Sequence, residues 1–499
     1  MKSIAMNVVP NKYPQAGRTL IRWARCIVVG TVGITLCGCA LHRPPPHPTI
    51  VDQALPKATP VPPNWSATRN AENVTGEWVK SFQDNGLEAV VSEAIANNLD
   101  LRQSASRVEA ARQSVIVVCS KLKPQVGANF SGATTRSEDM NTIEQNQSNT
   151  ELAAVSWEVD VWGRLRSQRA AAQESYEAIA LDYAFARQSL AATTAKSWYL
   201  AIETRQLLTL TEQSVNIYSE LLELVKVRRA AGKVADLDVA EASFQLDNAQ
   251  NQLTIAQGLY SKAQRTLEVL IGRYPAAELH VAEAFDPLPP PVAPGLPSSL
   301  MERRPDIVAA EHQVLAAFRT EEAAKLALLP DFSFTLKGGR LSDPLLSVLG
   351  LNPWLIHSAV GMFVPIYQGG ALRAQIKIAT AVQEQSIAYF GGVALRAFNE
   401  VEVALTNEQL LAVRLPYTEN AVRDHSEAVR VADLRYKAGS MDFLSVLQLQ
   451  SGQIESQADL IKLRNAQLAN RINLHLALGG SFDSSPATTF PAVRAPTKP

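Results

Sequence analysis

The chain has 499 residues, a formal net charge of −1 and an aromatic content of 6%. This near-neutral balance argues against a nucleic-acid-binding protein, because such proteins normally carry a clear basic excess. Alanine, glutamine, leucine and serine crowd the middle of the chain, a composition typical of long helices rather than of a compact enzyme.

The N-terminal segment has the pattern of a lipoprotein signal. A positively charged lead precedes an apolar run at 26–36, which is too short to span a bilayer comfortably as a permanent helix. The run ends in Leu36-Cys37-Gly38-Cys39, which resembles the lipobox of bacterial lipoproteins, where the cysteine after the cut receives the lipid. We therefore expect residues 1–38 to be a signal peptide and Cys39 to be the lipidated N-terminus. The alternative is an ordinary secretory signal with a chance cysteine.

The residues after Cys39 favour an outer-membrane destination. Position 40 is alanine rather than aspartate, which by analogy with enterobacterial sorting favours delivery to the outer membrane. Residues 39–63 are rich in proline and predict an extended tether between the lipid and the folded body. Besides Cys39, only Cys119 lies outside the signal peptide, so a disulfide framework is not expected.

An internal repeat organises the rest of the chain. The segment 98–102 is echoed by 304–308 at an offset of 206 residues, and 229–232 is echoed by 436–439 at an offset of 207. A near-constant offset over most of the chain predicts two structural halves. We place the halves and the C-terminal tail at 64–300, 301–480 and 481–499.

Each half predicts a β-hairpin. Apolar residues alternate with polar ones, as in Val155, Trp157 and Val159, and a period of two is typical of strands with one apolar and one polar face. The expected hairpins lie at about 125–162 and 331–368.

Long helices surround each predicted hairpin. Helices that end at a proline are expected before the hairpins, at about 87–122 and 302–328. After them, helical sequence runs over about 164–230 and 371–437, and a helix of about 65 residues is on the order of 100 Å long. Gly232 and Gly439 predict the turns that reverse the chain, because glycine adopts a positive φ without steric cost.

Four strands of this length can cross an outer membrane but cannot close into a barrel. An open sheet edge in hydrocarbon leaves backbone groups unsatisfied, at several kcal/mol each. The barrel must therefore be assembled from several chains, and three copies give about twelve strands, an even number within the known range. The predicted fold is a 12-stranded membrane β-barrel plus a long α-helical barrel, closed as a homotrimer. A pair of soluble hairpins is the alternative.

Several segments resemble the TolC-type outer-membrane factor family. They are the tips 229–239 and 435–447, the stretch Glu302-Arg303-Arg304-Pro305-Asp306, and the strand end Pro365-Ile366-Tyr367-Gln368-Gly369-Gly370. The lipobox places the chain in the lipoprotein branch typified by NodT. The resemblance covers about 70–480 and implies a homotrimer in the outer membrane with a helical barrel across the periplasm. It also implies a belt domain from parts of 64–86, 273–300 and 480–499.

The function implied by the resemblance is the passive exit duct of a tripartite efflux system. Small molecules would arrive from a periplasmic membrane-fusion adaptor and an inner-membrane pump, by analogy of the resistance-nodulation-division (RND) type. No cofactor is implied besides the lipid on Cys39. The alternatives are the duct of type I protein secretion and a structural envelope lipoprotein that forms no channel.

The resemblance assigns roles to residues at the two tips, where the family contacts its adaptor and narrows its channel. The docking positions in this chain would be Arg229, Gly232, Lys233, Arg435, Lys437, Gly439 and Ser440. The constriction positions would be Asp236, Asp238, Tyr436, Met441, Ser445 and Gln448. The last three stand where the best-known members carry charges, which favours a gate held by packing and neutral hydrogen bonds. Asp236 and Asp238 are either acidic groups at the entrance or helix caps.

Catalytic chemistry has no clear signature in the chain. The sequence contains no HExxH, P-loop, GxSxG or GxGxxG motif. The seven histidines are scattered without metal-ligand spacing. We therefore expect neither an enzyme nor a metal site.

Overall fold

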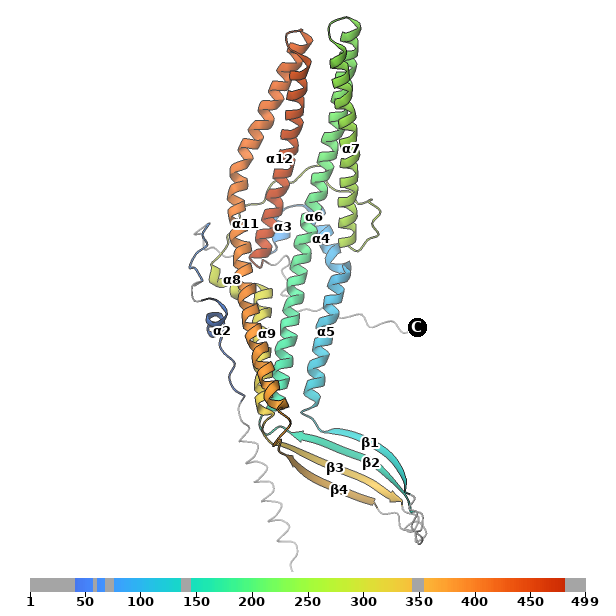
Figure 1. Ribbon diagram of the computed structural model, residues 1–499, viewed down its shortest axis with the longest axis vertical. Helices are drawn as coiled ribbons and strands as arrows, with labels where there is room; N and C mark the ends of the chain where they lie inside the picture. The colour runs from blue at the N-terminus through green and yellow to red at the C-terminus, as the bar shows by residue number, and fades with distance from the viewer. Residues whose placement is uncertain (1–40, 57–60, 68–75, 136–144, 343–353, 481–499) are drawn as a thin grey trace, which may run out of the picture. The chain divides into compact units, whose positions relative to one another are not determined.

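The computed structural model describes residues 41–56, 61–67, 76–135, 145–342 and 354–480 (Figure 1). The predicted signal peptide, the lipidation site at Cys39 and the tail 481–499 lie outside these ranges. The chain divides into two compact units, and each is considered by itself. The strand unit comprises residues up to 44, 116–171 and 318–381, and the helical unit comprises 45–115, 172–317 and residues from 382 onward.

The strand unit contains one antiparallel sheet in the order β1-β2-β3-β4. Its strands are β1 (Gln125–Thr135), β2 (Gln145–Val159), β3 (Asp331–Ser342) and β4 (Trp354–Phe363). Both predicted hairpins are therefore confirmed. In one chain, β1 and β4 are the edges of the described sheet, and each has a strand partner on one side only.

The register gives the sheet two chemically different faces. Trp157 pairs with Phe334, which pairs with Val360, so that these apolar residues form one row across three strands. The neighbouring row, on the opposite face, pairs Glu158 with Ser333. Side chains of directly opposed residues share a face, so the alternation expected from the sequence becomes a continuous apolar surface and a polar one.

The helical unit repeats one pattern twice. In the first half, α4 (Asn85–Asn97) and α5 (Leu99–Ser120) precede the long helix α6 (Arg164–Ala230) and the returning helix α7 (Asp236–Leu270). In the second half, the equivalent helices are α8 (Pro297–Arg303), α9 (Pro305–Leu326), α11 (Ala371–Lys437) and α12 (Phe443–Ala477). A short helix α3 (Trp78–Ser81) precedes α4. Among the described residues, no helix is both long and apolar enough to cross a membrane.

The helices expected at about 87–122 and 302–328 are each broken in two, at Asn98 and Arg304. The Asn98 side chain accepts a hydrogen bond from the Leu101 N–H (3.0 Å) and so caps α5. The residue before Pro305 is pushed out of the helical region by the proline ring. In both halves the side chain at the break donates to the end of the returning helix, Asn98 to the Leu270 carbonyl and Arg304 to the Ala477 carbonyl. The break thus fastens two helices together.

The predicted extended tether at 39–63 is wrong in part, because α2 (His47–Ala54) is a helix. Its residue Ile50 is fully buried in a core that includes Phe390 on α11 and Leu300 on α8. Trp65 extends the attachment by donating from its indole Nε1 to the Gly295 carbonyl (3.0 Å). Burial of these apolar side chains stabilises a docked segment where proline content alone predicted a free one.

A second core surrounds the middle of α6. Trp78 and Phe82 pack there with Trp198, Tyr199 and Leu267, all almost inaccessible to solvent. His475, at the end of α12, stacks on Trp78 with ring centroids 5.7 Å apart. These residues hold the bases of both helical hairpins and so determine where their tips lie.

Candidate functional site

The two hairpin tips have the same backbone geometry. Gly232 has φ of 69° and Gly439 has φ of 79°. At the first tip the Gly232 N–H donates to the Arg229 carbonyl and the Lys233 N–H to the Arg228 carbonyl. At the second tip the Gly439 N–H donates to the Tyr436 carbonyl and the Ser440 N–H to the Arg435 carbonyl, shortly before α12 begins at Phe443. This is the glycine-terminated helix end known as the Schellman motif. The predicted turns at Gly232 and Gly439 are confirmed.

All seven predicted docking residues are exposed at these tips. Figure 1 shows the tips, between α6 and α7 and between α11 and α12, at the same end of the helical unit. The basic residues are accompanied by exposed apolar ones at equivalent positions of the two halves. These pairs are Val227 with Leu434 and Leu237 with Leu444, each more than half exposed. Both tips therefore offer positive charge beside apolar surface.

The aspartates predicted at the constriction act locally as helix-stabilising groups. Asp238 Oδ2 accepts a hydrogen bond from the Ala235 N–H (3.1 Å) at the start of α7. Asp236 pairs with Arg229, and both side chains are largely exposed to solvent. The capping interpretation therefore describes Asp238, whereas Asp236 is a surface ion pair.

The equivalent cap on α12 is Asp442, which sequence reasoning missed. Its carboxylate accepts from the Ser445 N–H (2.8 Å) and from the Ser445 hydroxyl (2.6 Å). These hydrogen bonds lower the pKa of the Asp442 carboxyl below its ordinary value. The pattern Asp-x-x-Ser, which begins three residues after Gly439, was the available signal, because aspartate is a preferred N-cap.

Tyr436 lies in a packed core rather than on the surface. It is 3% exposed, its ring centroid lies 5.7 Å from that of Phe443, and the Arg228 guanidinium sits 4.2 Å above the ring. Arg228 Nη1 also donates to the Tyr436 carbonyl (2.6 Å) and so joins the two hairpins. Burial raises the pKa of the Tyr436 hydroxyl, and the nearby guanidinium opposes that shift.

The tip cluster is the apolar core to which Tyr436 belongs, and both hairpins contribute to it. Its buried members are Tyr218, Leu221, Leu222, Val225, Ala242, Ala249, Ala432, Tyr436, Phe443, Val446 and Leu447. Of the other predicted constriction residues, Met441 packs against this cluster, Ser445 is half-buried at the cap and Gln448 is exposed. The structure thus brings Tyr436 and Met441 into one core, whereas Ser445 is held at the helix cap by Asp442.

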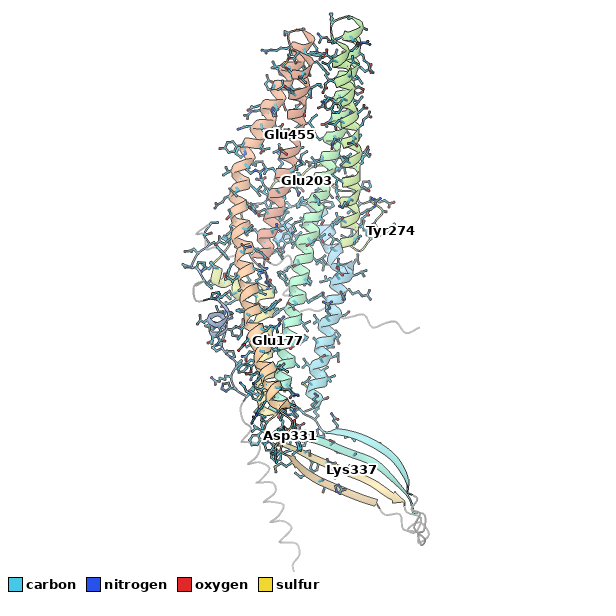
Figure 2. All side chains as sticks on the ribbon, viewed as in Figure 1. Glu177, Glu203, Tyr274, Asp331, Lys337 and Glu455 are labelled. Atoms are coloured by element: carbon cyan, nitrogen blue, oxygen red, sulfur yellow. The ribbon has the colours of Figure 1, made fainter. Side chains whose placement is uncertain are left out.

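A cavity of about 570 Å³ lies between α6, α7 and α12, next to the tip cluster. Its lining mixes apolar residues with polar ones such as Gln245, Asn248 and Glu455. Figure 2 labels Glu455 on this part of the helical unit. The sequence carried no signal for this groove, because its walls come from helices of both halves.

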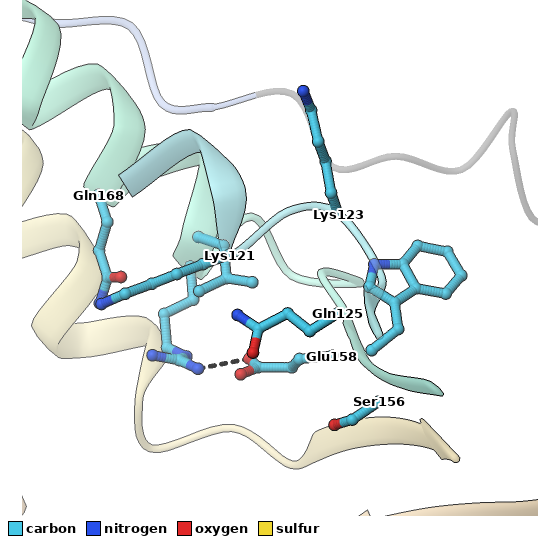
Figure 3. A pocket seen from close by; sticks show the side chains of 9 residues that line it. Lys121, Lys123, Gln125, Ser156, Glu158 and Gln168 are labelled. Atoms are coloured by element: carbon cyan, nitrogen blue, oxygen red, sulfur yellow. Dashed lines mark hydrogen bonds and ion pairs between the residues drawn. The ribbon is translucent and has the colours of Figure 1, made fainter. Parts of the chain in front are cut away.

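The strand unit holds a separate polar pocket of about 270 Å³ where the strands begin (Figure 3). Lys121 extends toward Gln168, and Arg164 pairs with Glu158 on the polar face of β2. Gln125 and Ser156 complete the polar wall. The pocket therefore belongs to the face of the sheet that does not carry the apolar rows.

Residues 90–273 and 296–480 match the family described as outer membrane efflux protein, one match for each half. The toluene efflux pump outer membrane protein TtgC of Pseudomonas putida is 29% identical over 90% of this chain and 93% of its own length. A solved membrane protein from Pseudomonas aeruginosa is 26% identical, with a TM-score of 0.78, over 90% of this chain and 99% of that one. A structure of CusC is 25% identical, with a TM-score of 0.76, over 89% and 100% of the two chains.

Proposed function

The chain belongs to the outer membrane efflux protein family, and from that premise we propose that its tips at Gly232 and Gly439 form the docking and closing end of the channel. The protein is the outer-membrane component of a tripartite efflux system, a trimer that works with an adaptor and an inner-membrane pump. The family consists of channel proteins rather than enzymes. That this particular chain catalyses no reaction is part of the proposal.

The observation that carries the docking role is the equivalence of the two tips. Each one ends in an exposed glycine turn, carries exposed Lys or Arg side chains and adds two exposed apolar residues at matching positions. A protein partner that meets both tips of each chain would find the same chemistry six times around a trimer. Exposed apolar residues next to basic ones are typical of surfaces that bind another protein.

The closing role belongs to the tip cluster. Because Tyr436 and Phe443 are buried between the hairpins, any outward movement of one hairpin would expose aromatic surface and break the Arg228 contact. Burying such side chains is favourable by roughly 2 to 3 kcal/mol each, enough to hold an end closed until a partner compensates. A gate held by this packing would agree with the gate of packing and neutral hydrogen bonds that the sequence favours.

Trimer contacts are supported by an exposed apolar stripe on α11. Val382 and Tyr389, and then Val403, Leu410 and Tyr417, recur every seven residues, with Arg396 at the position between the two groups. Each of the five apolar residues is between 44% and 72% exposed in a single chain. A seven-residue spacing is typical of helices that pack side by side. In the trimer this stripe would be covered by a neighbouring copy.

The transported compounds would be small molecules. TtgC is named for toluene, and another relative, OpmQ of Pseudomonas aeruginosa, is named for pyoverdine export. The polar pocket at the start of the strands would lie on the inner side of the barrel, because outward faces are apolar. The lipid on Cys39 and a pump of the RND type complete the proposal.

Photo-crosslinking in living cells tests the docking role. A photoreactive amino acid at Lys233 or Lys437 should capture a periplasmic adaptor, whereas the same residue at the exposed Lys123 of the strand unit should not. Mass spectrometry of the captured partner identifies it. Equal capture from all three positions, or none from the tips of a stable trimer, would remove the support for tip docking.

A further inference from the structure

One histidine and two glutamate side chains lie close together in the helical unit, far from the tips. His312 Nδ1 lies 2.7 Å from Glu174 Oε2 and 3.5 Å from Glu177 Oε2. The ligating atoms of all three lie within 4.8 Å of one another. Figure 2 labels Glu177 farther from the tips than Glu203 and Glu455. The sequence predicted no metal site here, because the two carboxylates precede the histidine by well over a hundred residues.

The helices hold this cluster in a fixed arrangement. Glu174 and Glu177 are three residues apart on α6, so they share one face of that helix. His312 comes from α9, where Ala309 and Ala310 are buried and permit close packing. The guanidinium of Arg304, the residue just before α9, lies 5.4 Å from the Phe185 ring centroid and provides a second contact with α6.

The charge around His312 is negative. Glu174, Glu177 and the neighbouring Glu311 surround a single imidazole, and Glu311 also contacts His47 (2.8 Å). The Glu174 hydrogen bond is the main reason that the pKa of His312 lies above its ordinary value, and burial partly opposes it. About three quarters of the Glu174 and His312 side chains are removed from solvent. A bound cation would compensate this half-buried negative charge.

We propose that Glu174, Glu177 and His312 form a binding site for a divalent transition-metal ion of the Zn²⁺ type, which joins α6 to α9. One imidazole and two carboxylates are a donor set suited to Zn²⁺, and three protein ligands leave a coordination position for water. Mg²⁺ and Ca²⁺ are less suitable because they require about six or more oxygen ligands.

The observed distances are compatible with metal binding. In a tetrahedral site with each ligand atom about 2 Å from Zn²⁺, two ligand atoms are about 3.3 Å apart. Since the ligand atoms of the cluster lie within 4.8 Å of one another, the widest pair needs to close by at most about 1.5 Å. On binding, the metal takes the Nδ1 lone pair of neutral His312, and any proton held there is released to solvent.

The consequence would be a metal link between the two repeats of each chain, since α6 belongs to the first and α9 to the second. A ligand that binds only the folded state raises its stability. Zn²⁺ should therefore increase the unfolding temperature of the trimer by several degrees. The site is separate from the tips, so its failure leaves the docking proposal untouched.

Calorimetric titration of the full-length trimer tests the proposal. The protein would be purified in detergent without a polyhistidine tag, treated with EDTA and titrated with Zn²⁺ and, separately, Mg²⁺. We expect one Zn²⁺ per chain at this site and no comparable Mg²⁺ binding. His312→Gln and the double variant Glu174→Gln/Glu177→Gln should each lower the Zn²⁺ affinity at least tenfold.

His280→Gln is the matched control, because His280 is exposed and its Nδ1 lies 2.9 Å from the backbone carbonyl oxygen of Glu278. Its Zn²⁺ binding and thermal shift should equal those of the wild type. Size-exclusion chromatography would verify that every variant remains a trimer. Unchanged Zn²⁺ affinity in His312→Gln, or no binding by the wild type at 100-fold molar excess, would overturn the assignment and leave an ordinary ion pair between helices.

Discussion

The two tips have the same backbone conformation but differ in the side-chain interactions that stabilise them. Arg229 and Asp236 form an exposed ion pair on the first tip, and the equivalent positions on the second, 207 residues later, are the buried aromatic pair Tyr436 and Phe443. Exposed ion pairs contribute about 0 to 1 kcal/mol, whereas burial of a large aromatic side chain contributes several times more. At these positions the second tip is therefore held more firmly, whereas the first tip relies on the members of the tip cluster below it, such as Val225 and Ala242.

The largest difference between the two tips is expected when the equivalent residues Arg229 and Tyr436 are truncated to alanine. Tyr436→Ala should destabilise the trimer by about 3 to 5 kcal/mol through the cavity it leaves, and Arg229→Ala by less than about 1 kcal/mol. Urea unfolding measures the loss, and entry of a large antibiotic into cells reports a leaking end. Tyr436→Phe is the control, expected to be near neutral because the Tyr436 hydroxyl is buried without a hydrogen-bond partner. Equal effects at both positions would contradict an anchored second tip.

The bases of the two hairpins are also expected to differ in how their stability depends on pH. His475 on α12 is equivalent to Glu268 on α7, and both are buried. Burial, aided by Arg471, lowers the pKa of His475 to about 4. Burial raises the pKa of Glu268, but three backbone N–H donors outweigh it, and the net shift is downward. The two halves therefore respond to acid in different ranges.

Below about pH 6.5 the unfolded chain binds a proton at His475 that the folded chain does not, so stability falls from there to about pH 4. The loss amounts to roughly 3 kcal/mol. Glu268 stabilises the fold above its unfolded pKa, and this contribution is lost only as pH falls below about 4.5. Unfolding of wild type and His475→Phe between pH 8 and 4 measures the difference. A wild-type slope that persists in His475→Phe would show that another group is responsible.

The smallest effects are expected at the helix caps. Asp442→Ala removes two hydrogen bonds from the start of α12 and should lower the unfolding midpoint by a few degrees at most, because it removes an N-cap. Asp236→Ala on the first tip removes only the exposed ion pair and should change the unfolding midpoint less. Thermal unfolding of both variants in parallel gives the ranking. The reverse order would mean that the first tip depends on its ion pair.

Most of the architecture was readable from the sequence because its signals are local and periodic. The repeat offset, the alternation of Val155, Trp157 and Val159, and the glycines at 232 and 439 each report on a few neighbouring residues. The family resemblance rested on the same segments. The positions of strands, long helices and turns follow from such patterns, since backbone preferences and facial alternation act over short ranges.

Only the tertiary structure shows which segments that are distant in the sequence contact each other. Three features depend on which helices pack against each other. They are the docking of α2, the burial of Tyr436, and the proximity of His312 to Glu174 and Glu177. The type of a residue determines which groups it can bind. Which residues lie next to it depends on how the helices of the two repeats pack. The sequence determined two hairpins with glycine tips, and packing determined that the equivalent positions form an exposed ion pair on one tip and a buried aromatic pair on the other.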